Sequence, residues 1–156
     1  MRRDFVLGKR VILGVGNILL KDEGVGVHVV KMMESMKLPE GVELVDGGTL
    51  GFDLLGIFEE SEKIVIVDAL KGGHKPGTIY KVTPEQLKGD LNRALSLHQV
   101  GLLEVMEMGK LLGFQPQVVI IGIEPKEIDW GMELSEEVKM KLPKVISLVL
   151  EEIKSA

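Results

Sequence analysis

Hydrophobic positions along the chain fall into short runs that alternate with stretches of helical spacing. Runs of four to eight apolar residues closed by glycine or acidic residues are typical of buried strands. Such runs lie at residues 11–16, 42–46, 63–68, 78–82 and 117–123. Stretches with apolar residues every three or four positions predict helices. These lie at about residues 24–36, 50–60, 97–112 and 135–154.

Two of the helices have clear starting signals. Ser96 is followed three residues later by Gln99, and this spacing predicts a capping box. In a capping box the side chain of each residue accepts a hydrogen bond from the backbone N–H of the other. Ser135 is expected to cap the last helix. Pro143 lies inside that last helix and predicts a kink or an interruption there, because proline lacks the N–H that a helix interior needs.

The strand at 78–82 breaks the alternation of strands and helices. Only about nine residues separate it from the strand at 63–68, and they form a glycine-rich loop. A parallel neighbour would need a crossover of a dozen or more residues, so this strand is predicted to run antiparallel. The pattern as a whole predicts one domain, residues 1–156. Its expected fold is a three-layer α/β/α sandwich around a mostly parallel five-stranded sheet with one antiparallel strand.

Composition narrows the possible chemistry. The 156 residues include no cysteine, three histidines, and 24 acidic against 19 basic side chains, a formal charge of −5. Thiolate metal sites and cysteine nucleophiles are therefore excluded, and nucleic acid is not an expected partner. Neither a signal peptide nor a run of apolar residues long enough to cross a membrane is visible, so a cytoplasmic protein without membrane insertion is expected.

Acidic residues follow the first three predicted strands. The first strand leads to Asp22 and Glu23, the second ends at Asp46, and the third ends at Asp68. Ligands of open α/β sheets bind beyond the carboxyl ends of the parallel strands, and His98, in the first turn of a helix, is expected at the same edge. Clustered carboxylates repel unless a proton or a cation joins them. Carboxylates with one imidazole therefore predict a divalent metal site, although a strand-ending Asp can also merely cap a turn.

Gly14-Val15-Gly16 follows a strand and resembles the start of a dinucleotide-binding fingerprint. The third glycine of that fingerprint would fall at Leu19, and Asp22 and Glu23 would repel a pyrophosphate, so a nucleotide site is disfavoured.

Three further residues have no assigned chemistry. His28 is expected to be a packed or surface residue of its helix, and His74 a solvated residue of its loop. Trp130, the single tryptophan, either caps the core or touches a partner.

Four segments together carry a family signature: residues 14–26, GVGNILLKDEGVG; residues 46–49, DGGT; residues 67–69, VDA; and residues 96–101, SLHQVG. In order and spacing they closely resemble the hydrogenase maturation endopeptidases, from about residue 10 to residue 150. The resemblance implies an α/β/α sandwich with one antiparallel strand. It also implies an aspartyl-type endopeptidase that removes a C-terminal extension from the large-subunit precursor of a nickel–iron hydrogenase, after nickel has been inserted.

The resemblance also assigns roles to residues. It implies that Glu23, Asp68 and His98 contact the metal; other members carry Asp at the position of Glu23. Asp46 matches a position suggested to take part in cleavage. Two ways of activating the water stay open: Asp46 as general base, or polarisation of the bond or the water by the nickel. The nickel would arrive with the precursor, which is the expected partner, so no tightly bound cofactor of the protein's own is expected. With no heptad or self-pairing segment visible, the expected state is a monomer.

Three alternatives stay open at this point. The chain could be a metallohydrolase with its own permanent divalent metal, a non-catalytic nickel-binding chaperone for the same precursor, or a nucleotide-binding domain. Metal analysis, a cleavage assay and a nucleotide titration distinguish them.

Overall fold

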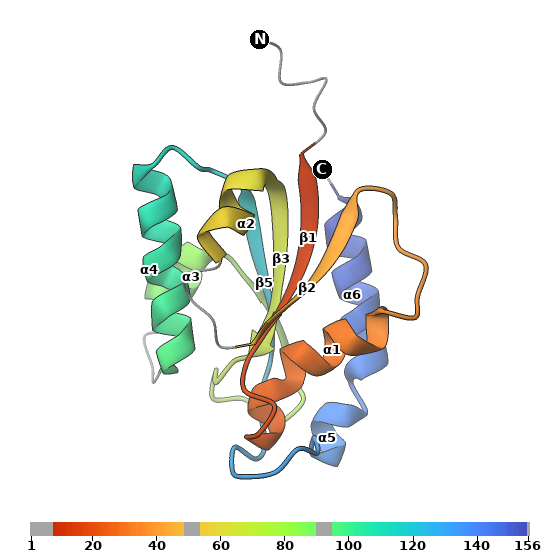
Figure 1. Ribbon diagram of the computed structural model, residues 1–156. Coiled ribbons are helices and arrows are strands. Elements are labelled where there is room, and N and C mark those ends of the chain that lie inside the picture. Colours follow the sequence, from red (N-terminus) through yellow and green to blue (C-terminus); the bar gives the residue numbers. More distant parts are fainter. Residues whose placement is uncertain (1–7, 49–53, 90–94, 156) are drawn as a thin grey trace.

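A five-stranded sheet runs through the middle of the computed structural model, which describes residues 8–48, 54–89 and 95–155 (Figure 1). The order of the strands is β2-β1-β3-β5-β4. Their bounds are β1 Lys9–Val15, β2 Val42–Gly48, β3 Ser61–Ala69, β4 Ile79–Val82 and β5 Gln117–Ile123. The four strands β2, β1, β3 and β5 pair in parallel, whereas β4 pairs with β5 antiparallel. The reversed strand predicted from the short loop before it is confirmed.

Helices cover both faces of the sheet. Their bounds are η2 Lys21–Gly24 (a 3₁₀ helix), α1 Val25–Met33, α2 Leu54–Glu60, α3 Pro84–Gly89, α4 Leu97–Leu111, α5 Glu136–Lys139 and α6 Leu142–Lys154. Helices α1 and α6 lie on one face, and α2, α3 and α4 on the other (Figure 1). The predicted three-layer α/β/α sandwich is confirmed.

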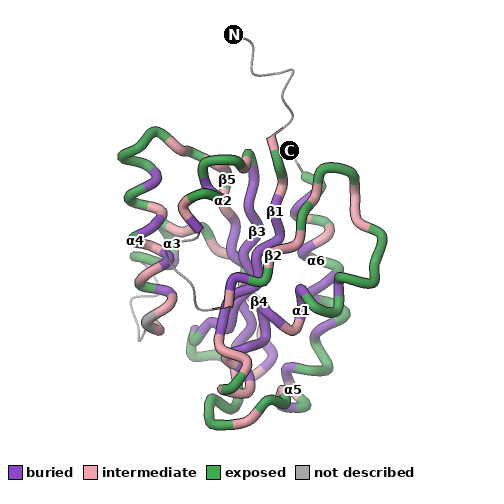
Figure 2. Tube along the Cα trace, viewed as in Figure 1, coloured by how far each residue is buried: buried purple, intermediate pink, exposed green. Residues whose placement is uncertain are grey.

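Each face of the sheet has its own apolar core. Alternate residues of β3 supply the two sides: Val65 and Val67 pack with α1 and α6, while Ile64 and Ile66 pack with α2 and α4. The middle strands are buried along most of their length (Figure 2). Burial on both faces explains why these strands are apolar at nearly every position instead of at every second one.

Helix ends follow the sequence signals closely. Ser96 accepts a hydrogen bond from the Gln99 N–H and the Gln99 side chain accepts one from the Ser96 N–H, which confirms the capping box. Ser135 caps α5, as predicted. The interruption expected near Pro143 is confirmed too: the predicted helix at 135–154 is divided into α5 and α6, with Pro143 in the first turn of α6.

Two short elements were not predicted, η2 and α3. Four and six residues are too few for a periodic apolar pattern. The predicted start of the helix at 50–60 falls partly outside the described residues, and α2 begins at Leu54.

A buried lysine ties the end of α6 to the sheet. Lys63, near the start of β3, donates from Nζ to the carbonyl oxygens of Glu152 and Ser155 at 2.6 and 3.1 Å, and lies 3.3 Å from the Glu152 carboxylate. Arg10 of β1 donates to the carbonyls of Ile153 and Ser155, each at 2.8 Å. The carbonyls that α6 leaves unpaired at its C-terminus are thus bound by two cations.

None of the helices in the described parts of the chain is both long and apolar enough to cross a membrane.

Candidate active site

Asp68 occupies the carboxyl end of β3 and is almost completely buried. Its Oδ1 accepts a hydrogen bond from the Ala69 N–H at 2.8 Å, and its Oδ2 accepts one from the Gln99 amide at 3.0 Å. The His98 Nε2 donates to the same carboxylate, 2.9 Å from Oδ2 and 3.1 Å from Oδ1. A buried carboxylate is stable only when it is well hydrogen-bonded, and these contacts meet that need.

His98 reaches Asp68 because of where α4 begins. The capping box of Ser96 and Gln99 fixes the first turn of the helix at the carboxyl end of β3 and puts His98 in that turn. Its Nδ1 lies 3.7 Å from Glu23 Oε2 and 3.1 Å from the Ser96 hydroxyl oxygen. The imidazole therefore lies between two carboxylates that come from separate parts of the chain.

Glu23 is carried by η2, which packs very tightly against the end of β1. Gly16 has φ +126°, and a Cβ at this position would lie 2.0 Å from the Glu23 carbonyl oxygen. A Cβ on Gly14 would lie 2.2 Å from the carbonyl oxygen of Gly26 in α1. Only glycine tolerates this backbone and these approaches. The glycines that resemble a dinucleotide fingerprint are thus explained by the packing of η2 and α1 onto the strand ends.

Glu23, Asp68 and His98 form one cluster. One ligand atom from each lies within 4.8 Å of the other two, so a single cation between them could contact all three. The Glu23 and His98 side chains are only 12% and 10% exposed, which leaves the cluster reachable from one side. Two carboxylates and one imidazole suit a divalent first-row metal, and three protein ligands leave coordination positions open.

Burial and mutual contact shift the pKa of each member of the cluster. Burial raises the pKa of Asp68, although the bonds from His98 and Gln99 oppose it. Burial also raises the pKa of Glu23; His98 lowers it and the nearby Asp68 raises it further. Burial alone would lower the pKa of His98, but the carboxylates of Asp68 and Glu23 together raise it above its ordinary value. All three groups therefore hold protons more tightly than free side chains do.

Asp46 does not join this cluster. It is exposed on β2, the edge strand, and β1 separates it from β3. Along β2, Asp46 lies on the same face of the sheet as Val42 and Leu44, which is the face covered by α1 and α6. Asp68 lies on the opposite face, which is covered by α4. Its Oδ1 accepts a hydrogen bond from the Gly48 N–H at 3.1 Å.

The sequence profile of the hydrogenase maturation protease family matches residues 27–152. The chain belongs to this family. Its members are endopeptidases, so the protein is a peptide hydrolase, as the sequence motifs predicted.

Relatives of this maturation protease match over most of the chain. A putative hydrogenase maturation protease of Methanocaldococcus jannaschii is 36% identical over 149 residues, covering 92% of this chain and 96% of the relative. The hydrogenase 2 maturation protease of Escherichia coli is 33% identical over 143 residues, covering 90% and 87%. Among solved structures, the hydrogenase maturating endopeptidase HybD from Escherichia coli superimposes with a TM-score of 0.87 at 32% identity, covering 94% of this chain and 92% of that one.

The sequence did not predict the contact between Gln99 and Asp68. The Gln99 amide donates both to Asp68 and to the Ala69 carbonyl oxygen, at 3.0 and 2.8 Å. The capping-box motif identified Gln99, but only as a helix cap. Its position directly after the candidate ligand His98 was the available signal, because a residue next to a ligand often orients the site.

Asp22, the neighbour of Glu23, is fully buried and stabilises the fold of the protease through hydrogen bonds. It accepts hydrogen bonds from the N–H groups of Lys126, Glu127 and Ser135 and from the Ser135 hydroxyl, at 2.8 to 3.0 Å. Asp22 thus fixes the connection between β5 and α5.

The other histidines lie apart from the cluster. His28 is half-buried in α1; burial lowers its pKa, and its Nε2 has no hydrogen-bond partner among the described residues. His74 is exposed, with its Nδ1 3.2 Å from the Tyr80 hydroxyl oxygen.

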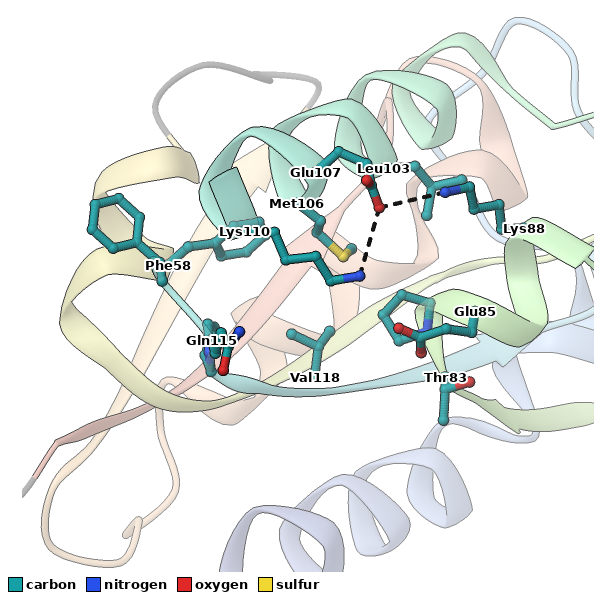
Figure 3. A pocket seen from close by; sticks show the side chains of 13 residues that line it. Phe58, Thr83, Glu85, Lys88, Leu103, Met106, Glu107, Lys110, Gln115 and Val118 are labelled. Atoms are coloured by element: carbon teal, nitrogen blue, oxygen red, sulfur yellow. Dashed lines mark hydrogen bonds and ion pairs between the residues drawn. The ribbon is translucent and has the colours of Figure 1, made fainter. Parts of the chain in front are cut away.

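Two pockets differ in their relation to the cluster. A small pocket of about 150 Å³ borders it and is lined by Glu23, Ala69, Lys71, Leu95, Ser96, Gln99, Pro125 and Ile128. A second, of about 320 Å³, lies between α3, α4 and the start of β5, at the opposite end of the strands (Figure 3). There Glu107 is 3.4 Å from Lys88 and 3.8 Å from Lys110. The smaller pocket includes Glu23 of the cluster, whereas none of the three cluster residues lines the larger one.

Proposed function

We propose that this protease removes the C-terminal extension from the large-subunit precursor of a nickel–iron hydrogenase, and that Glu23, Asp68 and His98 recognise the nickel the precursor carries. The observation that supports the proposal is the clustering of one ligand atom from each of these three residues within 4.8 Å. The protein contributes oxygen and nitrogen donors and no thiolate, since it has no cysteine.

In this proposal nickel is part of the substrate. Open coordination positions on an ion held by three protein atoms allow the ion to stay bound to the precursor while the cluster contacts it. Contact with the cluster would fix the precursor with its scissile peptide beside the carboxyl ends of the strands. The nickel, as part of the substrate, supplies Lewis-acid polarisation of the peptide or of water.

Hydrolysis also requires a base for the attacking water. Asp46 remains our candidate, because its carboxylate is exposed and it lies at the carboxyl end of β2, the end of the sheet that also holds the cluster. If Asp46 is the base, Asp46→Asn will lose cleavage and keep nickel binding. Unchanged cleavage by this variant would leave activation of the water to the nickel.

The decisive experiment is mass measurement of a nickel-loaded precursor before and after incubation with the protein. We expect a shortened product with the wild type and none with Asp68→Ala or His98→Ala, because each variant removes a nickel contact. His74→Ala is the matched control, since His74 is exposed and outside the cluster. Cleavage by either cluster variant would refute the nickel-contact role.

We also expect nickel-free precursor to remain uncut. Efficient cleavage of metal-free precursor would contradict nickel recognition. Stoichiometric zinc in protein purified without added metal would favour a resident metal, and binding without a shortened product would favour a chaperone. The cytoplasmic location and the monomeric state stay predictions of the sequence.

A further inference from the structure

Four large apolar side chains are exposed beside the cluster. Ile128, Trp130 and Met132 lie within five consecutive residues of the connection between β5 and α5, with 38%, 75% and 60% of their surface exposed. Leu19, from the connection between β1 and η2, is 48% exposed. We call these four residues the apolar patch. Apolar patches that lie next to functional sites often mark surfaces where a partner binds.

The backbone that carries the patch is firmly held. Gly131 donates from its N–H to the Leu19 carbonyl at 2.9 Å and accepts from the Lys21 N–H at 2.8 Å, which joins the two connections. The buried Asp22 holds both ends of the β5–α5 connection through its four hydrogen bonds. The apolar side chains are thus presented to solvent from a fixed frame.

The patch is continuous with the candidate active site. Ile128 and Pro125 line the small pocket together with Glu23 and Gln99. The β5–α5 connection lies at the same end of the molecule as the start of α4, which carries His98 (Figure 1). A protein that binds at the small pocket therefore meets the edge of the patch at Ile128.

Charges around the patch favour one kind of partner. Of three nearby lysines, Lys21 pairs with Glu127 at 3.8 Å and Lys126 with Glu137 at 2.7 Å. The third, Lys71, lies on the pocket side of the patch, where its charge acts on Glu23. Asp129 and Glu133 are exposed and form no ion pair within the described parts of the chain. The surface is thus apolar with an excess of negative charge, which complements an apolar segment that carries Lys or Arg.

We propose that the apolar patch is the docking surface for the hydrogenase large-subunit precursor, which binds it with an apolar segment flanked by basic residues. This inference rests on the proposed function. A second copy of the chain is a poorer occupant, because its own patch carries the same excess of negative charge and would repel this one.

The test compares two double variants by the kinetics of precursor cleavage. Trp130→Ser with Met132→Ser removes the two most exposed side chains of the patch. Leu111→Ser with Leu112→Ser is the matched control, since these residues are 88% and 57% exposed at the far end of α4 from His98. We expect the patch variant to raise KM for the nickel-loaded precursor by about tenfold to a hundredfold with kcat unchanged, as for loss of an aromatic anchor. The control should keep wild-type kinetics.

Binding is measured separately by titration calorimetry of precursor against each protein, with thermal unfolding to verify the fold. A wild-type KM in the patch variant overturns the proposal. So does a loss of self-association in that variant with unchanged precursor binding, which would make a second copy the occupant. If the wild type does not cleave the precursor, the proposed function is refuted. The docking proposal is then judged by binding: it holds if the patch variant loses precursor binding while the wild type and the control variant keep it. Should the double variant fail to fold, the single Trp130→Ser variant replaces it under the same criteria.

Discussion

Gln99 connects the end of a strand to the start of a helix through one amide group. Its Nε2 binds Asp68 and the Ala69 carbonyl, while its Oε1 accepts from the Ser96 N–H. These bonds fix the orientation of the carboxylate that His98 contacts. Under the proposed function Gln99 is a positioning residue, because it would act on the nickel only through Asp68.

We predict that Gln99→Leu weakens Ni²⁺ binding by the free protein by about tenfold to a hundredfold, since Asp68 loses a fixed partner. Gln86→Leu is the matched control: Gln86 forms the same capping bonds with Thr83, away from the cluster. Titration calorimetry measures both. Equal losses in the two variants would mean that capping alone matters.

Nickel binding by the free protein should also strengthen as the pH rises. Metal binds the deprotonated ligands, and the two carboxylates raise the pKa of His98 above 6.5. Protons therefore compete with the metal up to a higher pH than for a free imidazole, and affinity falls as the pH drops through that raised pKa. Calorimetry in a pH series from about 5.5 to 8.5 covers this range. An affinity independent of pH would contradict the predicted ligand set.

At the scale of elements, η2 and the β5–α5 connection depend on one buried carboxylate. We predict that Asp22→Asn destabilises the protein by about 2 kcal/mol, because an amide nitrogen cannot accept the bonds that the carboxylate accepts. Hydrogen exchange should accelerate at Lys126, Glu127 and Ser135. Asp129→Asn, in the same connection but exposed, is the control and should leave both measurements near wild type. Unchanged exchange in Asp22→Asn would show that the connection is held by other contacts.

Several elements were predictable because a local rule governs each of them. Loop length determined the direction of the strand at 78–82, and Pro143 marked the division between α5 and α6. The carboxyl-end rule brought Glu23, Asp68 and His98 to one edge.

The carboxyl-end rule predicts the edge of the sheet at which a residue lies but not the face. It therefore grouped Asp46 with the cluster, although β1 lies between β2, which carries Asp46, and β3, which carries Asp68. The contacts of Asp22 with Ser135 join residues 113 positions apart, and no local pattern in the sequence encodes such a pair.

At the scale of the molecule, different groups of charged residues lie at the two ends of the sheet. The cluster lies at the carboxyl ends of the strands, while the Lys63 and Arg10 contacts with α6 lie at the start of β3 and β1. The contacts that hold the C-terminus of α6 at one end of the sheet should therefore be separable by mutation from the cluster at the other end.

We predict that Lys63→Met lowers the free energy of unfolding by about 3 kcal/mol, because it leaves buried carbonyls and the Glu152 carboxylate with fewer partners. The melting temperature should fall by roughly 6–12 °C, with kcat and KM for the precursor unchanged. Lys81→Met is the control: Lys81 binds the same Glu152, at 2.8 Å, from an exposed position, so its loss should matter far less. A loss of activity below the melting temperature would contradict the separation.

The arrangement of the three cluster residues along the chain has a consequence for synthesis. Glu23, Asp68 and His98 are far apart in sequence, and β3, which carries Asp68, lies between β1 and β5. A growing chain that has passed residue 98 still lacks β5, so the strand under Asp68 remains open on one side. We therefore expect the cluster to assemble only after β5 has been synthesised, so a chain truncated before Gln117 should lack this arrangement of the three residues.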